Sequence, residues 1–155
     1  MLRTLIAALC ALVPAASLTT GAAAQVSAEQ RVLREVVTVT PEGERVVTEE
    51  PAARVAPGDR VIYRLAYTNE GAAPATGLVL VMPVPEGIVL DPSATEGPGA
   101  VAFSLEGERF AALGDLTRPD GAAATAADVR SVRWTLGDPV PPGGSGEVAF
   151  KGVLR

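Results

Sequence analysis

The stretch Val55–Gly71 constrains the fold of this chain more than any other. After a Pro-Gly-Asp turn signal, its side chains alternate with a period of two, which is typical of a strand buried on one face. The Asn-Glu-Gly sequence at its end favours backbone angles that a strand does not use. We therefore predict a central strand here. Its predicted core-facing residues are Val61, Tyr63, Leu65 and Tyr67, and its outward-facing residues are Arg60, Ile62, Arg64, Ala66 and Thr68.

The chain after this strand consists of short apolar runs separated by glycine and proline. Runs of this length and spacing are typical of an antiparallel β-sandwich. Thr76–Met82 is apolar on both faces, so we expect the core to cover one face and other groups to cover at least part of the second. We expect a turn at Asp91–Ser93 and a helical turn within Ala122–Ala127. The other predicted strands are Ile88–Leu90, Val101–Leu105, Arg109–Leu113, Val129–Leu136 and Glu147–Leu154.

Residues 25–54 form a separate N-terminal segment. Its first residues, Gln25–Gln30, are predicted to be loose. The β-branched runs Val32–Thr40 and Arg45–Thr48 flank Pro41–Glu44, a pattern that predicts a hairpin. Two interpretations remain open: the hairpin supplies edge strands of the sandwich, or it protrudes and docks on a partner, with Val32–Thr40 as a long edge for strand pairing.

Residues 1–24 resemble a secretory signal. Arg3 is followed by the apolar run Leu5–Val13, which is too short to span a bilayer, and Ala22–Ala24 is an A-x-A cleavage site. We expect the exported protein to start at Gln25 and to reside in the periplasm or outside the cell. The alternative is an uncleaved N-terminal anchor. The single cysteine, Cys10, would leave with the signal, so the mature chain would have no thiol.

The composition argues against several kinds of catalysis and binding. The chain has 155 residues, room for one domain (55–155) beside the two N-terminal segments. Its formal charge of −5 argues against nucleic-acid binding. It has no histidine, the commonest general base and metal ligand, so no serine has that activating partner. The adjacent acids Glu49/Glu50 and Glu106/Glu108 fall on predicted edges and turns, where a solvated face is the simplest explanation.

Two further kinds of site have candidate residues in this sequence. Six aspartates at predicted turns provide oxygen ligands for calcium, although no D-x-D-x-D-G spacing occurs and aspartate is also a turn former. Lys151 and Asn69 are the only lysine and asparagine, the residue types of an isopeptide crosslink, but the alternation of the last strand points Lys151 outward. Gly143–Gly146 is expected to be a hairpin turn. The six aspartates considered as calcium ligands are Asp59, Asp91, Asp115, Asp120, Asp128 and Asp138.

Three segments together resemble one family: PGDRVIYRLAYTNEG, then ATGLVLVMPVPEGI, then VRWTLGDPVPPGGSGEVAFKGVL. The family is the bacterial surface-repeat module catalogued as domain of unknown function 11, and the resemblance runs from about Val55 to Leu154. It implies an immunoglobulin-like sandwich in exported proteins that is usually non-catalytic. Met82 and Pro83 stand where the family often has an acid, which weakens a polar or calcium role there, and we find only a single copy.

These observations predict an all-β, immunoglobulin-like antiparallel sandwich of about seven strands plus the N-terminal hairpin. We expect a non-catalytic exported module with a structural or protein-interaction role. No residue is assigned a catalytic, cofactor-binding or metal-binding role. The expected partner is another envelope or secreted protein, with no nucleic acid and no membrane span after cleavage. A calcium- or carbohydrate-binding secreted module is the alternative, although Trp134, Tyr63 and Tyr67 have the parity of the core.

Overall fold

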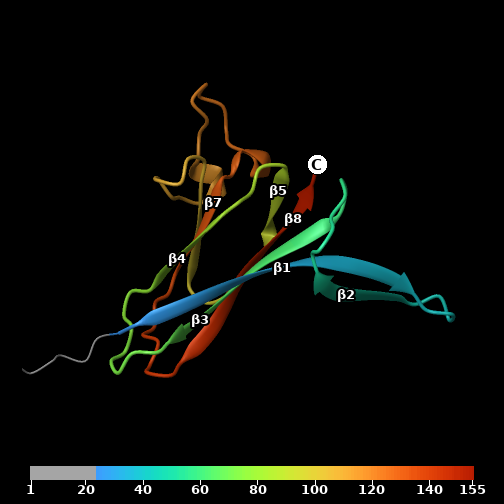
Figure 1. Ribbon diagram of the computed structural model, residues 1–155. Coiled ribbons are helices and arrows are strands. Elements are labelled where there is room, and N and C mark those ends of the chain that lie inside the picture. The colour runs from blue at the N-terminus through green and yellow to red at the C-terminus, as the bar shows by residue number, and fades with distance from the viewer. Residues whose placement is uncertain (1–23) are drawn as a thin grey trace, which may run out of the picture.

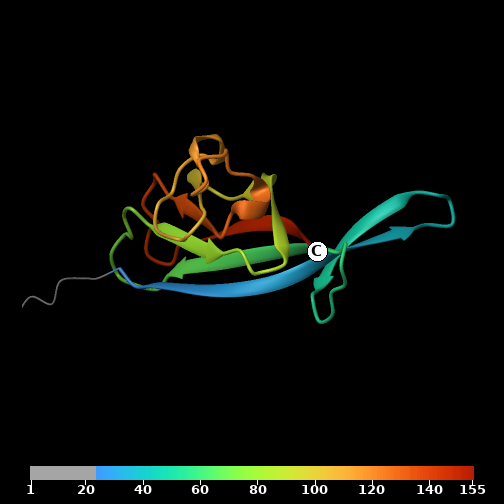
Figure 2. The same ribbon diagram turned by 90° about the horizontal axis from the view of Figure 1, so that it is seen from above.

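The fold consists of two antiparallel sheets, seen in a computed structural model that describes residues 24–155. The longer strands form one layer and the shorter strands the other (Figures 1 and 2). The predicted signal segment lies outside the described residues, apart from Ala24. No helix in the described part of the chain is long and apolar enough to cross a membrane.

The larger sheet has five strands in the order β2-β1-β3-β8-β5. β3 is the predicted central strand, and it pairs with β1 on one side and β8 on the other. The strand bounds are β1 Val26–Val39, β2 Arg45–Pro51, β3 Arg60–Asn69, β5 Ile88–Glu96 and β8 Ser145–Leu154.

The smaller sheet has three strands in the order β4-β7-β6, and the connection from β6 to β7 contains two short 3-10 turns. The turn at Ala126–Asp128 overlaps the end of the predicted helical turn Ala122–Ala127. The bounds are β4 Val79–Pro83, β6 Ala100–Ser104, β7 Ser131–Thr135, η1 Leu113–Asp115 and η2 Ala126–Asp128.

The core lies between the two sheets, and the alternation in β3, β7 and β8 predicts its contents. Val61, Tyr63 and Tyr67 of β3 are buried in one cluster, and Leu65 packs against that cluster. Trp134 of β7 and Phe150 of β8 are fully buried in the same cluster. The expectation of an all-β sandwich is therefore confirmed. Hydrophobic burial from both layers holds it together.

The start of β1 differs from the prediction. Gln25–Gln30 was expected to be loose, but β1 begins at Val26 and pairs with β3 from Val26↔Asn69 to Arg34↔Val61. The backbone groups of β3 need partners along this side, and Val26 packs against the core. Long-range pairing thus orders residues whose local sequence is typical of a loose segment.

Three predictions in the second half of the chain were wrong. Asp91–Ser93 is not a turn between strands, because β5 continues through it with a register shift between Asp91 and Thr95, as a β-bulge allows. Arg109–Leu113 is not a strand, since only Ala111 bridges Phe103 before the 3-10 turn begins. Val79 and Val81 are 49% and 47% exposed, so β4 is covered on one face only.

Candidate protein-interaction site

The turn aspartates serve their own loops and do not converge. Asp59 accepts a bond from the amide of Ala56 at 2.8 Å, and the Asp128 carboxylate accepts bonds from both the amide and the hydroxyl of Thr125. Asp120 accepts a bond from the Ala122 amide at 3.0 Å. Within residues 24–155 no group of three or more His, Cys, Asp or Glu residues gathers at a common point. Turn formation accounts for these three carboxylates.

The other candidate residues also have structural partners. Asn69 is fully buried and donates to the carbonyls of Ala73 and Val140 at 2.8 and 2.9 Å. Lys151 pairs with Ile62, seven residues away from Asn69 along β3, and bonds instead with Glu35 at 2.9 Å. The two side chains are therefore far apart and cannot be linked.

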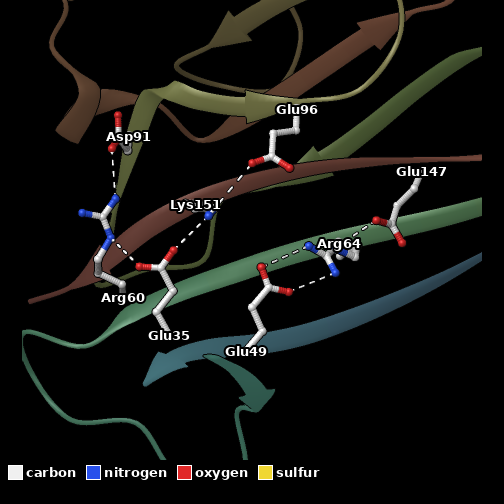
Figure 3. A network of polar contacts seen from close by, with 8 residues as sticks. All are labelled: Glu35, Glu49, Arg60, Arg64, Asp91, Glu96, Glu147 and Lys151. Atoms are coloured by element: carbon white, nitrogen blue, oxygen red, sulfur yellow. Dashed lines mark hydrogen bonds and ion pairs between the residues drawn. The ribbon is translucent and has the colours of Figure 1, made fainter. Parts of the chain in front are cut away.

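Charged side chains cross the outer face of the larger sheet (Figure 3). Glu35 of β1 lies at their centre, 3.1 Å from Arg60 of β3 and 2.9 Å from Lys151 of β8. Arg60 also contacts Asp91 of β5 at 3.3 Å, and Lys151 lies 4.0 Å from Glu96. The pKa of Lys151 is raised, chiefly by the hydrogen bond to Glu35 and by the negative charges around it, against the opposing effect of burial.

A second group of charges centres on Arg64 of β3. Its Nη1 lies 3.1 Å from Glu49 of β2, and its Nε lies 3.0 Å from Glu147 of β8, the latter as an ion pair outside hydrogen-bond geometry. Glu49 and Glu50 lie on opposite faces of β2, and Glu50 pairs with Arg34 at 3.3 Å. These acids are thus not a carboxylate pair for acid–base chemistry.

The charged layer explains two buried residues on the outer face. Ile62 of β3 is 0% exposed and Ala149 of β8 is 2% exposed, although both have the parity that points away from the core. We infer that the aliphatic stems of the surrounding Arg and Lys side chains cover them. The charged side chains therefore cover this part of the sheet. Each of the three bases, Arg60, Arg64 and Lys151, is paired with more than one acid.

Alkaline pH should weaken this protein. The pKa values of Tyr63 and Tyr67 are raised by burial, and that of Lys151 by its acidic neighbours. Groups whose pKa is raised by folding stabilise the fold fully below their unfolded pKa and lose that contribution as pH rises through the folded value. We expect the free energy of unfolding, measured with urea, to fall above about pH 10.

The variant Lys151→Arg is the matched control for this decline, because arginine keeps its charge at high pH and can still reach Glu35. It should lose less stability than the wild type between about pH 10 and about pH 11. An unfolding free energy that stays constant over this range in the wild type would contradict the expectation.

A cavity of about 450 Å³ lies where β3 ends and β8 begins. Its lining includes the buried residues Tyr67, Leu136 and Val140 together with prolines and glycines of the loops, and Asp138 is its one charged lining residue. Tyr67 is only 4% exposed, so its ring offers no open face for stacking a sugar. The cavity does not have the features of a carbohydrate site.

The β1–β2 hairpin extends beyond both layers (Figures 1 and 2). We call its outer part, Val36–Thr48, the ribbon. The predicted hairpin is confirmed, since Val39 pairs with Arg45 and Val37 with Val47. The ribbon lies beyond the last pair of β1 with β3, Arg34↔Val61. A two-stranded ribbon without a layer behind it is marginally stable in water by itself.

The ribbon carries an unusual share of exposed apolar side chains. Val37 and Val47 are 46% and 57% exposed and lie opposite each other on one face, with Val39 beside them. Every residue of β2 is exposed. Five of the eight large apolar side chains exposed in the described chain lie on β1 or β2, and Val37, Val39 and Val47 share one face of the ribbon. The five are Val32, Val37, Val39, Val46 and Val47.

The ribbon also has open strand edges. The Thr40 amide bonds to Glu44, so even-numbered residues face across the hairpin and odd-numbered residues point their amide and carbonyl groups outward. On β2 the outward residues are Arg45, Val47 and Glu49. On β1 the open edge is limited to 35–39, shorter than the predicted edge Val32–Thr40, because β3 pairs with β1 up to Arg34.

Comparison with known proteins adds no assignment: no family model, no curated protein and no solved structure matches this chain. The resemblance to the surface-repeat module rests on the sequence motifs alone. The ribbon was anticipated from β-branched residues flanking a turn, whereas its projection beyond the sandwich depends on where β3 begins.

Proposed function

We propose that this protein is a non-catalytic, exported β-sandwich module that binds another protein of the cell envelope or the extracellular space, and that the ribbon is the element that binds. The observation that carries this proposal is the exposed valine surface on a ribbon with open strand edges. The sequence of residues 1–24, which resembles a secretory signal, supports a location outside the cytoplasm, and so does the resemblance of its motifs to a surface module.

Strand addition is the mode of binding that the ribbon favours. An extended segment of the partner would form main-chain hydrogen bonds with an open edge, and its apolar side chains would cover Val37 and Val47. Exposed long edges are usually blunted by charge or proline. Here Pro51 ends β2, and the acids Glu42 and Glu44 lie at the turn, but the middle of the ribbon carries valine and threonine.

The alternative functions lack comparable support. Calcium binding would need converging oxygen ligands, and the turn aspartates are instead spread over separate loops. Carbohydrate binding would need an open aromatic face, and Trp134, Tyr63 and Tyr67 are all buried. A hydrolase would need a paired acid and base, and Glu49 and Glu50 lie on opposite faces of β2.

Replacing Val37 and Val47 by threonine tests the proposal. Threonine keeps the strand propensity and approximate shape of valine but makes the surface polar. Capture of the partner from native cells, quantified by crosslinking and mass spectrometry of the tagged protein, should fall by about tenfold or more. The unfolding free energy should change by less than about 1 kcal/mol, because both side chains are exposed.

The matched control is the same substitution at Val79 and Val81 of β4, which are similarly exposed but lie on the other sheet. It should leave capture unchanged. Equal losses in both double variants would assign binding to surface apolarity in general and contradict a role of the ribbon. Both double variants leave Val26–Arg34 unchanged. A deletion of residues 25–48 would be a poorer test, because it would also remove the part of β1 that pairs with β3.

A further inference from the structure

We infer that β2 of one molecule pairs antiparallel with β2 of a second copy, so that two larger sheets join into one continuous sheet. β2 is an edge strand of its sheet. The inference goes beyond the proposed function, because it assigns the β2 edge to self-association. The valine face and the β1 edge at 35–39 remain available to another partner.

The backbone of β2 is self-complementary in one register. Its outward-pointing residues are Arg45, Val47 and Glu49, and Pro51 has no amide hydrogen to donate. If Val47 lies on a two-fold axis opposite Val47 of the second copy, Arg45 pairs with Glu49 of the other molecule in both directions. This register uses all three outward residues, whereas a shift by one step toward the base places Pro51 in a donor position.

The side chains in this register are complementary in charge. Arg45 has no ion-pair partner of its own among residues 24–155, and the register sets it directly opposite Glu49 of the second copy. Glu49 already pairs with Arg64 of its own chain. In the dimer its carboxylate would lie between that arginine and Arg45 of the second copy. Direct cross-strand pairs of opposite charge favour pairing, and like charges oppose it.

The apolar side chains in this register also meet. Val47 lies beside Val37 on one face of each ribbon. The two-fold axis therefore brings Val37 and Val47 of both copies into one row, with the Arg45–Glu49 pairs on either side. Such an isologous contact closes on itself and gives a dimer, not a filament.

Sedimentation of the mature protein tests the inference. The wild type should pass from monomer to dimer between about 1 µM and about 1 mM, and the dimer should weaken as salt increases. Val47→Pro removes the central outward amide of β2 and should raise the dissociation constant by about tenfold or more. Val39→Pro, which removes an outward amide on the β1 side and lies outside the Val37–Val47 row, is the matched control and should leave the dimer intact.

Charge reversal tests the register itself. Arg45→Glu and Glu49→Arg should each remain monomeric, because each places like charges opposite one another. An equimolar mixture of the two variants should form a heterodimer, since every cross-strand pair is then of opposite charge. The emission of Trp134, remote from the ribbon in the core, verifies that each variant is folded.

A wild type that stays monomeric up to about 1 mM would overturn the inference, as would a dimer that Val47→Pro does not weaken. Failure of the mixture to associate, with both variants folded, would overturn the register. None of these results depends on capture of a partner protein, so the proposed function stands or falls separately.

Discussion

Replacing Trp134 by alanine is expected to lower the free energy of unfolding by about 3–5 kcal/mol. Trp134 lies on β7, is 0% exposed, and belongs to the one cluster that includes residues of both sheets. Alanine would remove the largest fully buried side chain and leave a cavity that a sheet backbone cannot close. Urea denaturation followed by circular dichroism measures the loss.

Two further observations sharpen this prediction. The emission of Trp134 should be blue-shifted in the folded protein, because its indole is shielded from water. Its Nε1 is buried without a hydrogen-bond partner, so Trp134→Phe should cost clearly less than Trp134→Ala, since it removes that unpaired group and fills most of the space. Emission at the wavelength of free tryptophan, with little loss of stability in the alanine variant, would contradict burial at this position.

Replacing Asn69 by aspartate should also destabilise the fold by about 3–5 kcal/mol at neutral pH. Asn69 is buried at the end of β3, and its Nδ2 donates to the carbonyls of Ala73 and Val140. Its Oδ1 accepts a bond from the Gly71 amide at 3.1 Å. Aspartate has nearly the same shape but would place a negative oxygen against two carbonyl oxygens.

The pH dependence distinguishes this mechanism from a loss of packing. A protonated aspartate can donate one of the two lost hydrogen bonds, so the deficit of Asn69→Asp relative to wild type should shrink as pH falls. The control Asn69→Ala introduces no charge, and its deficit should not depend on pH in this way. A deficit of equal size in both variants at every pH would show that the negative charge of aspartate is not the cause of its destabilisation.

Local sequence determined the strands and their inward faces wherever one face is buried. The period of two in β3, β7 and β8 is set by the geometry of each strand alone, so the burial of Tyr63, Trp134 and Phe150 could be predicted from the sequence. The hairpin of β1 and β2 could be predicted for the same reason, because turn chemistry at Pro41–Glu44 acts over a few residues.

Only the tertiary structure decided what depends on neighbours distant in sequence. β3 orders the start of β1 through backbone pairing, and charges from five strands gather on the outer face of the larger sheet (Figure 3). Ile62 has the parity of this face and is nonetheless fully buried. The candidate site has the same origin. β3 begins at Arg60 and pairs with β1 no further than Arg34, so the ribbon projects with its valines exposed and its edges open. Hydrogen bonds and burial across sheets form between segments that a local pattern cannot bring together, and they set where the sandwich ends and the interaction surface begins.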